Sequence, residues 1–421
     1  MAAAVESPTA RLPRSFGRYT LFDFIGRGGM AEIYLARQKT DFSGARLCVV
    51  KQILPELAGD PRFSEMLVHE AKLAARLSHA NVVQVYDLGR EDERLFIAME
   101  YVEGFDLNEL LRRCARQHVA LPFELGVHVI REALRGLDYA HRRTSDDGEP
   151  LGLVHRDVSP SNLLLSFHGE VKLCDFGIAR ANELLKSVNA EGLGEALKGK
   201  AGYMSPEHAR GESLDARSDV FAAGIVLWEL AAGRRMHRAA ETAEDSLEIA
   251  RRGEVPVLPQ TALPEEEQLR AILGKALSAD RDGRYASAAA MLREVDDYAS
   301  AAQLLTSPLQ LGEWLERTFG EEIVGRRRSR ERVVSALERG PLVQMEPIAV
   351  PPSGPVVAGS VDLGPPSSEA VPAVRSVEAS LDRDGAYRAG GANVPLGRVM
   401  LVGVLVALLV VIAVLAMTLG R

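Results

Sequence analysis

The sequence predicts an α+β protein with two lobes, a small sheet-rich lobe followed by a larger helical one. Two patterns predict this arrangement. Before about Met99, short runs of β-forming residues alternate with one helical stretch, Pro61–Leu77. From there to about Ser300 the chain is mostly helical. The space between two such lobes is a natural ligand site.

The elements follow in chain order after an N-terminal arm, residues 1–18. The expected strands are Tyr19–Ile25, Glu32–Gln38, Arg46–Gln52 and Leu95–Met99. The clearest helices of the second lobe are Phe123–Arg142 and Asp219–Ala232. The two lobes together occupy residues 19–300.

Residues 301–340 are expected to form a helical extension. Apolar side chains recur there at helical spacing, at Trp314, Leu315, Phe319 and Ile323. The extension also carries a basic run, which is Arg326, Arg327, Arg328, Arg330 and Arg332. Its simplest interpretation is a solvated helix face, and contact with an anionic lipid or a partner is the alternative.

The end of the sequence predicts a disordered linker and a membrane anchor. Residues 341–397 hold nine of the 21 prolines and one aromatic, Tyr387, so they cannot bury enough apolar surface to fold. Residues 399–420 carry no charge, and as a helix they would span roughly 33 Å, which matches a bilayer better than a buried core helix. Four arginines shortly before this run and one after it place the N-terminal bulk in the cytoplasm. We expect a single-pass tail anchor in the cell membrane.

Composition narrows the class of the folded part. The chain has 421 residues, 47% of them hydrophobic, which excludes a wholly disordered or collagen-like protein. Its three cysteines lie far apart in sequence, so they form neither a disulfide framework nor a CxxC pair, and a reducing compartment is expected. The net charge of −8 argues against nucleic acid as the main partner.

A glycine-rich motif stands between the first two expected strands. Gly26, Gly28 and Gly29 would let a hairpin approach the phosphates of a ligand, where a side chain would hold the backbone away. Glycine turns between strands are common, so this motif alone is a weak signal. It does not match GxxxxGK[ST], and no helix follows at once, so a P-loop or Rossmann site fits poorly.

A lysine follows in the next expected strand. Lys51 ends an apolar run, and such a lysine usually extends to solvent. The alternative is a cation held in the cleft against phosphate oxygens, oriented by a carboxylate. Glu70, in the first expected helix, is the available partner, and Glu65 is the competing choice.

The strongest signal is a set of oxygen-bearing side chains on two turns. Asp157 and Asn162 lie in the motif HRDVSPSN, and Asp175 lies in DFG. Their chemistry suits Mg²⁺, which takes a few protein oxygens together with phosphate and water. Together, the four signals in this order are very unlikely to arise by chance.

With these motifs, residues 19–300 resemble the protein kinase family, specifically the eukaryotic-like serine/threonine kinases of bacteria. The resemblance implies a bilobal kinase fold, ATP and Mg²⁺ as cofactors, and protein substrates. It implies that Lys51, paired with Glu70, holds the α- and β-phosphates, that Asp157 orients the substrate hydroxyl and accepts its proton, and that Asn162 and Asp175 bind the metal. The nucleotide-binding residues that it implies are Ile25, Gly26, Arg27, Gly28, Gly29, Met30, Ala31, Ile33, Lys51, Glu100 and Val102.

Three further residues complete the resemblance. Glu207 matches the end of the activation segment, and Arg284 would be its ion-pair partner. Asp219 matches the aspartate that braces the catalytic loop. Between Ile178 and Gly199 the only hydroxyl belongs to Ser187, which would be the activating phosphorylation site if that loop needs one.

Two departures from the family pattern concern the site of phosphate transfer. Ser159 stands where the catalytic-loop lysine is usual, and Lys200 stands where a threonine is usual. Because these positions touch each other in the family, we expect that the cation has changed sides and that Lys200 is a catalytic residue. The alternative is a solvated Lys200 in a weakened enzyme.

The function predicted is transfer of the γ-phosphate of ATP to serine or threonine hydroxyls by a membrane-tethered kinase. A nucleotide-binding pseudokinase that acts as an anchored scaffold is the alternative, kept open by Ser159 and by Ala31 in place of the third glycine. A tyrosine kinase is less expected, because the catalytic loop lacks the arginine-containing variant typical of that class.

Overall fold

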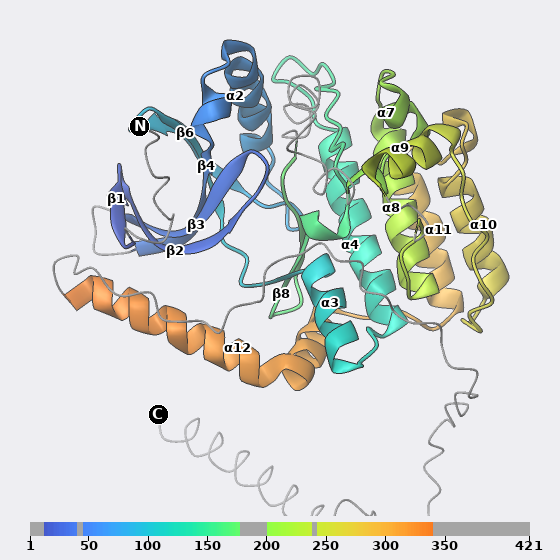
Figure 1. Cartoon of the computed structure of the whole chain (residues 1–421). Coiled ribbons are helices and arrows are strands. Elements are labelled where there is room, and N and C mark those ends of the chain that lie inside the picture. The colour runs from blue at the N-terminus through green and yellow to red at the C-terminus, as the bar shows by residue number, and fades with distance from the viewer. Residues whose placement is uncertain (1–11, 40–44, 177–199, 238–241, 340–421) are drawn as a thin grey trace, which may run out of the picture. The chain divides into compact units, whose positions relative to one another are not determined.

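The computed structural model describes residues 12–39, 45–176, 200–237 and 242–339. The N-terminal lobe is built on an antiparallel sheet. Six strands pair in the order β1-β2-β3-β4-β6-β5 (Figure 1). They are β1 (Arg14–Phe16), β2 (Tyr19–Arg27), β3 (Ala31–Lys39), β4 (Ala45–Ile53), β5 (Val85–Glu91) and β6 (Arg94–Glu100). The sheet therefore starts at Arg14, inside the arm that was predicted to precede it, because β1 pairs with β2.

Alternation along β4 decides which side of the sheet Lys51 faces. Cys48 and Val50 are buried in an apolar cluster on one face, whereas Val49 and Ile53 pack in the cluster on the other. Since successive side chains of a strand point to opposite faces, Lys51 lies on the face of Val49 and Ile53. On that face the sheet is covered by α1 (Pro55–Ala58) and α2 (Pro61–Ala75).

The helix α2 matches the predicted helix within two residues. The carboxylate of Asp60 caps it by accepting the backbone N–H of Arg62 at 2.9 Å, and Pro61 occupies its first turn. Its buried face repeats every three or four residues. That face consists of Phe63, Leu67, Glu70, Ala71 and Ala74.

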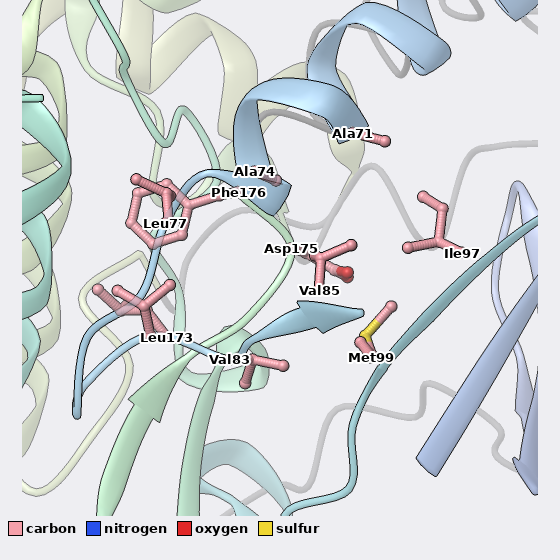
Figure 2. Close-up of a pocket in the computed structure, with 11 residues that line it drawn as sticks. Ala71, Ala74, Leu77, Val83, Val85, Ile97, Met99, Leu173, Asp175 and Phe176 are labelled. Atoms are coloured by element: carbon pink, nitrogen blue, oxygen red, sulfur yellow. The ribbon is translucent and has the colours of Figure 1, made fainter. Parts of the chain in front are cut away.

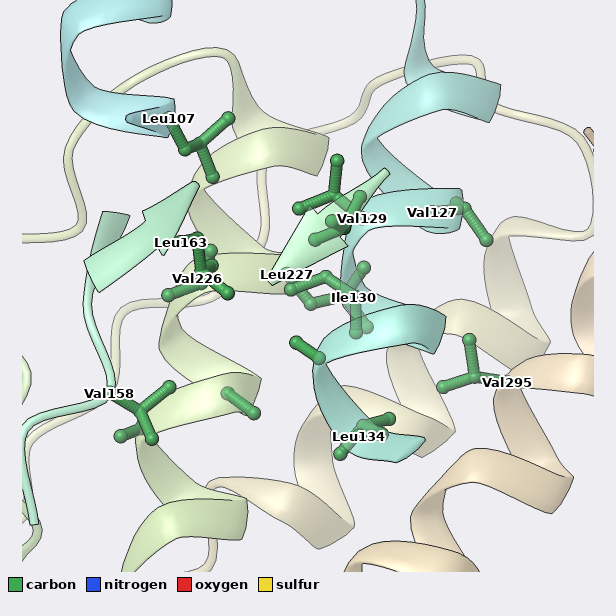
Figure 3. Packing of buried hydrophobic residues seen from close by; sticks show 14 of the residues in the cluster. Leu107, Val127, Val129, Ile130, Leu134, Val158, Leu163, Val226, Leu227 and Val295 are labelled. Carbon is green, nitrogen blue, oxygen red and sulfur yellow. The ribbon is translucent and has the colours of Figure 1, made fainter. Parts of the chain in front are cut away.

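The second lobe is built around α4 and α8. Figure 3 shows Ile130 of α4 packed with Leu227 of α8 and Val295 of α11. Nearly every residue of α8 is buried, as expected for a helix that is apolar all round. The helices of this lobe are α3 (Leu107–Gln117), α4 (Phe123–His141), α7 (Pro206–Arg210), α8 (Ala216–Ala232), α9 (Ala243–Arg252), α10 (Glu266–Ala276), η2 (Arg281–Gly283) and α11 (Ala288–Ala301).

A second, three-stranded sheet carries the catalytic motifs. It has the order β7-β8-β9, formed by β7 (Gly104–Asp106), β8 (Leu163–Ser166) and β9 (Val171–Leu173). The one-turn helix η1 (Pro160–Asn162) leads into β8. A Cβ on Gly104 would lie 1.8 Å from the backbone oxygen of Leu165, so only glycine lets these strands approach so closely.

The predicted extension is a long helix, α12 (Pro308–Arg339), with non-helical backbone angles at Phe319. Its apolar residues Leu311, Trp314, Leu315, Phe319 and Ile323 belong to the core cluster of the second lobe. No helix among the described residues is both long and apolar enough to cross a membrane. The linker 341–397, the apolar run 399–420, Ser187 and residues 1–11 lie outside the described part of the chain.

Candidate active site

The glycine-rich motif forms the turn between β2 and β3. The strand β2 ends at Arg27, whose side chain is exposed, and Gly29 lies in the bend that follows. The N–H of Gly28 donates to the carbonyl of Ala31 at 2.9 Å and closes the turn. A Cβ added to Gly26 would meet no atom within 4 Å, and one added to Gly28 would meet only the Ala31 oxygen, at 3.9 Å. Internal packing therefore does not explain glycine at these two positions. Their small size leaves space for a ligand against the backbone.

The remaining residues predicted for this loop differ in exposure. Met30 and Ala31 are buried in the small-lobe core with Phe63, so only their backbone can face a nucleotide. Ile25 is 51% exposed, and Ile33 is half-buried. These two side chains are the apolar groups of the motif that remain accessible.

Lys51 and Asp175 form an ion pair between the two lobes. The Nζ atom of Lys51 lies 2.9 Å from Oδ1 and 3.0 Å from Oδ2 of Asp175, and Lys51 is buried. Burial alone would raise the pKa of the Asp175 carboxyl, but the charge of Lys51 outweighs it and lowers that pKa. Asp175 is therefore held as a carboxylate at the end of β9.

The predicted pairing of Lys51 with Glu70 stays a prediction. Glu70 lies on the buried face of α2. Both oxygens of Asp175 lie within hydrogen-bond reach of the Lys51 ammonium, so Asp175 is an orienting carboxylate of Lys51. Figure 2 shows the pocket beside Asp175, which Ala71 and Met99 help to line.

Lys200 reaches the catalytic turn. Its Nζ contacts Oδ2 of Asp157, and the two side chains are 40% and 12% exposed. Burial opposes the charge of Lys200, but Asp157 and Asp175 raise its pKa above the ordinary value. The predicted approach of Lys200 to this turn is thus present. The hydroxyl of Ser159, in contrast, lies 3.0 Å from that of Ser161 and not on Lys200 or Asp157.

A network of hydrogen bonds to backbone groups fixes the geometry of this turn. Asn162 donates a hydrogen of its side-chain Nδ2 to the carbonyl of Asp157 at 2.7 Å, and its backbone carbonyl accepts the N–H of Cys174 at 3.0 Å. The Nε2 atom of His155 lies 2.9 Å from the carbonyl of Cys174. The turns of Asp157 and Asp175, 18 residues apart in sequence, are therefore held side by side.

Asp219 holds the backbone just before Asp157 in place, as the sequence predicted. Its two oxygens accept the backbone N–H groups of His155 at 2.7 Å and of Arg156 at 2.8 Å, and Nε2 of His141 lies 2.8 Å from Oδ2. Burial alone would raise the pKa of Asp219, but His141 and His155 lower it. Arg156 has a φ of 67°, a left-handed conformation that these hydrogen bonds stabilise.

The predicted ion pair of Glu207 with Arg284 is present and is bidentate. The two nitrogen–oxygen distances are 2.7 and 2.8 Å, and the side chains are 4% and 0% exposed. The hydroxyl of Ser218 also donates to Glu207 at 2.6 Å. Burial alone would raise the pKa of Glu207, but Arg284 and Ser218 lower it to about 2.

The predicted hinge, Glu100 to Val102, begins at the last residue of β6. The carboxylate of Glu100 is held by Lys172 at 2.9 Å, so only its backbone can meet an adenine. Val102 packs against the small-lobe core. Val49 and Leu164 pack there as well. These two residues and Met99 are candidate contacts of a base that were not singled out from the sequence; the position of Met99 directly before the expected hinge could have identified it.

The donor set fits Mg²⁺. Nδ2 of Asn162 is used by the carbonyl of Asp157, which leaves its amide oxygen as the donor atom, and Asp175 supplies a carboxylate. Mg²⁺ favours a few such oxygens, with water and phosphate in its other positions. No group of three or more His, Cys, Asp and Glu residues gathers as a metal site in the described part of the chain.

Comparisons with known proteins agree with this geometry. The family described as protein kinase domain matches residues 19–295. A protein named tyrosine-protein kinase MasK from Myxococcus xanthus is 38% identical over 319 residues, covering 75% of this chain and 48% of that protein. A probable serine/threonine-protein kinase PknB from Bifidobacterium longum is 36% identical over 294 residues, covering 67% and 40%.

Solved structures show the same fold. The crystal structure of the PknI kinase domain from Mycobacterium tuberculosis has a TM-score of 0.51 and 27% identity, and the match covers 68% of this chain and 97% of that domain. The chain spans about half or less of the length of the two curated relatives. The fold, the paired motifs and the family match over residues 19–295 together establish that the chain belongs to the protein kinase family.

Proposed function

We propose that this chain transfers the γ-phosphate of ATP to serine or threonine hydroxyls of proteins. The observation that carries the proposal is the convergence of two cation–carboxylate pairs, Lys51 with Asp175 and Lys200 with Asp157. Phosphoryl transfer needs an aligned nucleophile and neutralised charge more than covalent help from the protein. The two lysines supply positive charge that can neutralise phosphate, and Asp157 can align the nucleophile.

Each side chain has a proposed role. Lys51 holds the α- and β-phosphates, and the turn Gly26–Ile33 covers them. Asp157 orients the substrate hydroxyl and accepts its proton as the oxygen attacks phosphorus. Lys200 neutralises charge on the transferring group from beside Asp157. The ribose and adenine lie against the hinge, where Ile25 and Val102 would contact them.

Asn162 and Asp175 would hold Mg²⁺ through their oxygen atoms. When bound, the metal neutralises charge on the phosphates. The hydrogen bond from Asn162 to the carbonyl of Asp157 holds the amide of Asn162, and the ion pair with Lys51 holds the carboxylate of Asp175. The chain thus positions both metal-binding side chains before a ligand binds.

The choice of hydroxyl is part of the proposal. The relatives named above carry both descriptions, a tyrosine kinase at 38% identity and a serine/threonine kinase at 36%. We favour serine and threonine because the catalytic loop HRDVSPSN lacks the arginine-containing variant of tyrosine kinases. Analysis of the phosphorylated amino acids in a product distinguishes the two.

A nucleotide-binding scaffold is the second candidate. Ser159 in place of the usual catalytic-loop lysine and Ala31 in place of the third glycine favour it. The two candidates share nucleotide binding and differ only in transfer.

The test uses the full chain with radiolabelled ATP, Mg²⁺ and casein as acceptor. Transfer to serine or threonine, lowered about 10²- to 10⁴-fold by Asp157→Asn, is the expected result. Chelation of Mg²⁺ should abolish it. Binding of nucleotide with no transfer above the Asp157→Asn background would establish the scaffold instead, and label on tyrosine alone would overturn the hydroxyl assignment.

We also propose that residues 399–420 tether the kinase domain to the cell membrane, on its cytoplasmic side. The support is the uncharged length of this run and the arginines before it. The full chain should remain with membranes after carbonate extraction, and Leu408→Arg with Val411→Arg should release it. Equal extraction of both proteins would contradict the tether.

A further inference from the structure

Two of the three residues between the lobes face α12. β6 ends at Glu100 and β7 begins at Gly104, so Tyr101, Val102 and Glu103 form the link between the two sheets. Val102 packs against the small-lobe core. Tyr101 and Glu103 instead contact arginines of α12.

These contacts are specific and largely shielded from solvent. Nη2 of Arg330 lies 2.9 Å from Oε1 of Glu103, and Nη1 donates to the hydroxyl of Tyr101 at 3.1 Å. Nε of Arg327 donates to the same Oε1 at 3.0 Å. The Arg330 and Glu103 side chains are 17% and 22% exposed. One carboxylate of the link is thus shared by two guanidinium groups.

The other end of α12 is anchored on the second lobe. Gly169 has a φ of +87°, and a Cβ there would lie 1.6 Å from the carbonyl oxygen of Pro308, at the start of α12. Further along, the ring of Phe319 packs edge-on against Phe105 of β7, with centroids 5.7 Å apart. Figure 1 shows α12, in orange, running past α3. Because the start of the helix is fixed, its arginines reach the link from a defined position.

These contacts also show what part of the basic run does within the chain. Arg326 lies 3.0 Å from Glu109 of α3, and Arg327 and Arg330 hold Glu103. The prediction of a simply solvated face is therefore wrong for Arg327 and Arg330, whereas Arg326 is paired but still 42% exposed. Arg328 and Arg332 are exposed as well, so only Arg327 and Arg330 of the run are held against the link.

We propose that α12 is a hinge clamp, in which Arg327 and Arg330 hold Glu103 and Tyr101 and so set the position of the link for nucleotide binding. The two arginines are positioning residues, since they act through the link and touch no nucleotide. The proposal rests on the proposed function in one respect, because the ligand that it concerns is ATP. It predicts that ATP affinity depends on a helix that lies outside the matched kinase domain, residues 19–295.

The test compares Arg327→Gln, Arg330→Gln and Glu103→Gln with the matched controls Arg328→Gln and Arg332→Gln in the full chain. We expect the first three to raise KM for ATP about two- to fivefold, the size of a partly exposed ion pair, with little change in kcat. The two controls should match the wild type. Arg330→Lys should restore part of the affinity, because it keeps the charge beside Glu103. The double variant Glu103→Gln with Arg330→Gln should be no worse than the stronger single variant.

A second measurement does not need kinase activity. Hydrogen exchange of the amides of residues 100–104, without nucleotide, should be faster in Arg327→Gln and Arg330→Gln than in either control. Unchanged exchange together with unchanged KM would overturn the clamp. If neither the wild type nor any variant transfers phosphate, the proposed function fails, while the exchange measurement still decides whether α12 restrains the link.

Discussion

The ammonium of Lys200 lies against the carboxylate of Asp157, although 43 residues separate them in the sequence. The contact brings the end of the activation segment onto the catalytic turn. It places a cation on the carboxylate that would receive the substrate proton. The catalytic loop itself lacks its usual lysine, because Ser159 stands at that position. With its pKa raised by Asp157 and Asp175, Lys200 stays charged at neutral pH.

Replacing Lys200 should therefore slow phosphate transfer. We expect Lys200→Met to lower kcat about a hundredfold, the loss typical of removing one charged group that stabilises a transition state. Affinity for ATP should change little, because Lys51 and Asp175 are intact. Steady-state transfer to casein measures kcat, and a rate equal to wild type would show that Lys200 is only solvated.

A rescue variant makes this test specific to charge placement. Lys200→Thr combined with Ser159→Lys restores the usual arrangement of the family, with the cation on the catalytic loop. We expect Lys200→Thr alone to be impaired and the double variant to recover most of the rate. Failure of the double variant, with its melting temperature unchanged, would indicate that the two positions do not substitute for each other.

Lys51 offers a second prediction, on binding rather than transfer. Lys51→Met removes the cation that holds Asp175, at 2.9 Å, and should weaken the binding of a fluorescent ATP analogue about tenfold or more. Lys72→Met, an exposed lysine on α2, is the control and should bind as wild type. Equal affinity of all three proteins would remove Lys51 from the nucleotide site.

The sequence predicted the lobes because their patterns are local, and it missed features that depend on tertiary pairing. β5 was not predicted, since its residues include Asp87, Gly89 and Arg90 and are mostly only half-buried at the edge of the sheet. β1 is a strand only through its pairing with β2. Alternation and helical periodicity, by contrast, located the other strands of the first sheet and α2 to within two residues.

The site shows the same division. Motif spacing predicted Asp157 beside Asn162, because both lie in the turn that leads into β8. The approach of Lys200 was expected from the resemblance to the family, in which the two positions touch each other. The sequence offered Glu70 and Glu65 as partners of Lys51 and did not point to Asp175, because the approach of Asp175 to Lys51 depends on how the two lobes pack. The hinge contacts of Arg327 and Arg330 were invisible for a similar reason, since a charged helix face gives no sign of its partner.

The Glu207–Arg284 pair predicts a pH-dependent stability. Because the pKa of Glu207 falls to about 2 in the folded chain, its ionised form stabilises the fold. The contribution is fully present above the ordinary pKa of 4.5 and is lost as the pH falls toward 2. Glu207→Gln should lower the free energy of unfolding by about 3 kcal/mol at pH 7, since it leaves Arg284 buried without its partner.

The pH series supplies the check. The difference between wild type and Glu207→Gln, measured by urea unfolding, should shrink between pH 5 and pH 3. Glu248→Gln, which removes an exposed carboxylate that pairs with Arg252, should leave the unfolding curve unchanged. A difference that is constant over this pH range would show that the ion pair is not the cause.

Asp219 should control the rate and not the affinity. Its two oxygens each accept one backbone N–H of the catalytic turn, from His155 and from Arg156. Asp219→Asn keeps the shape but turns one acceptor into an amide donor that faces an N–H group, so the left-handed Arg156 loses its support. We expect kcat to fall about ten- to a hundredfold through misplacement of Asp157, with KM for ATP nearly unchanged.

Asp215→Asn, at the start of the same helix α8, is the control. It replaces one good N-cap by another and should leave kcat unaltered. A rise in KM for ATP with constant kcat would instead place the effect of Asp219 on the nucleotide site, because the turn of Asp157 would then be intact.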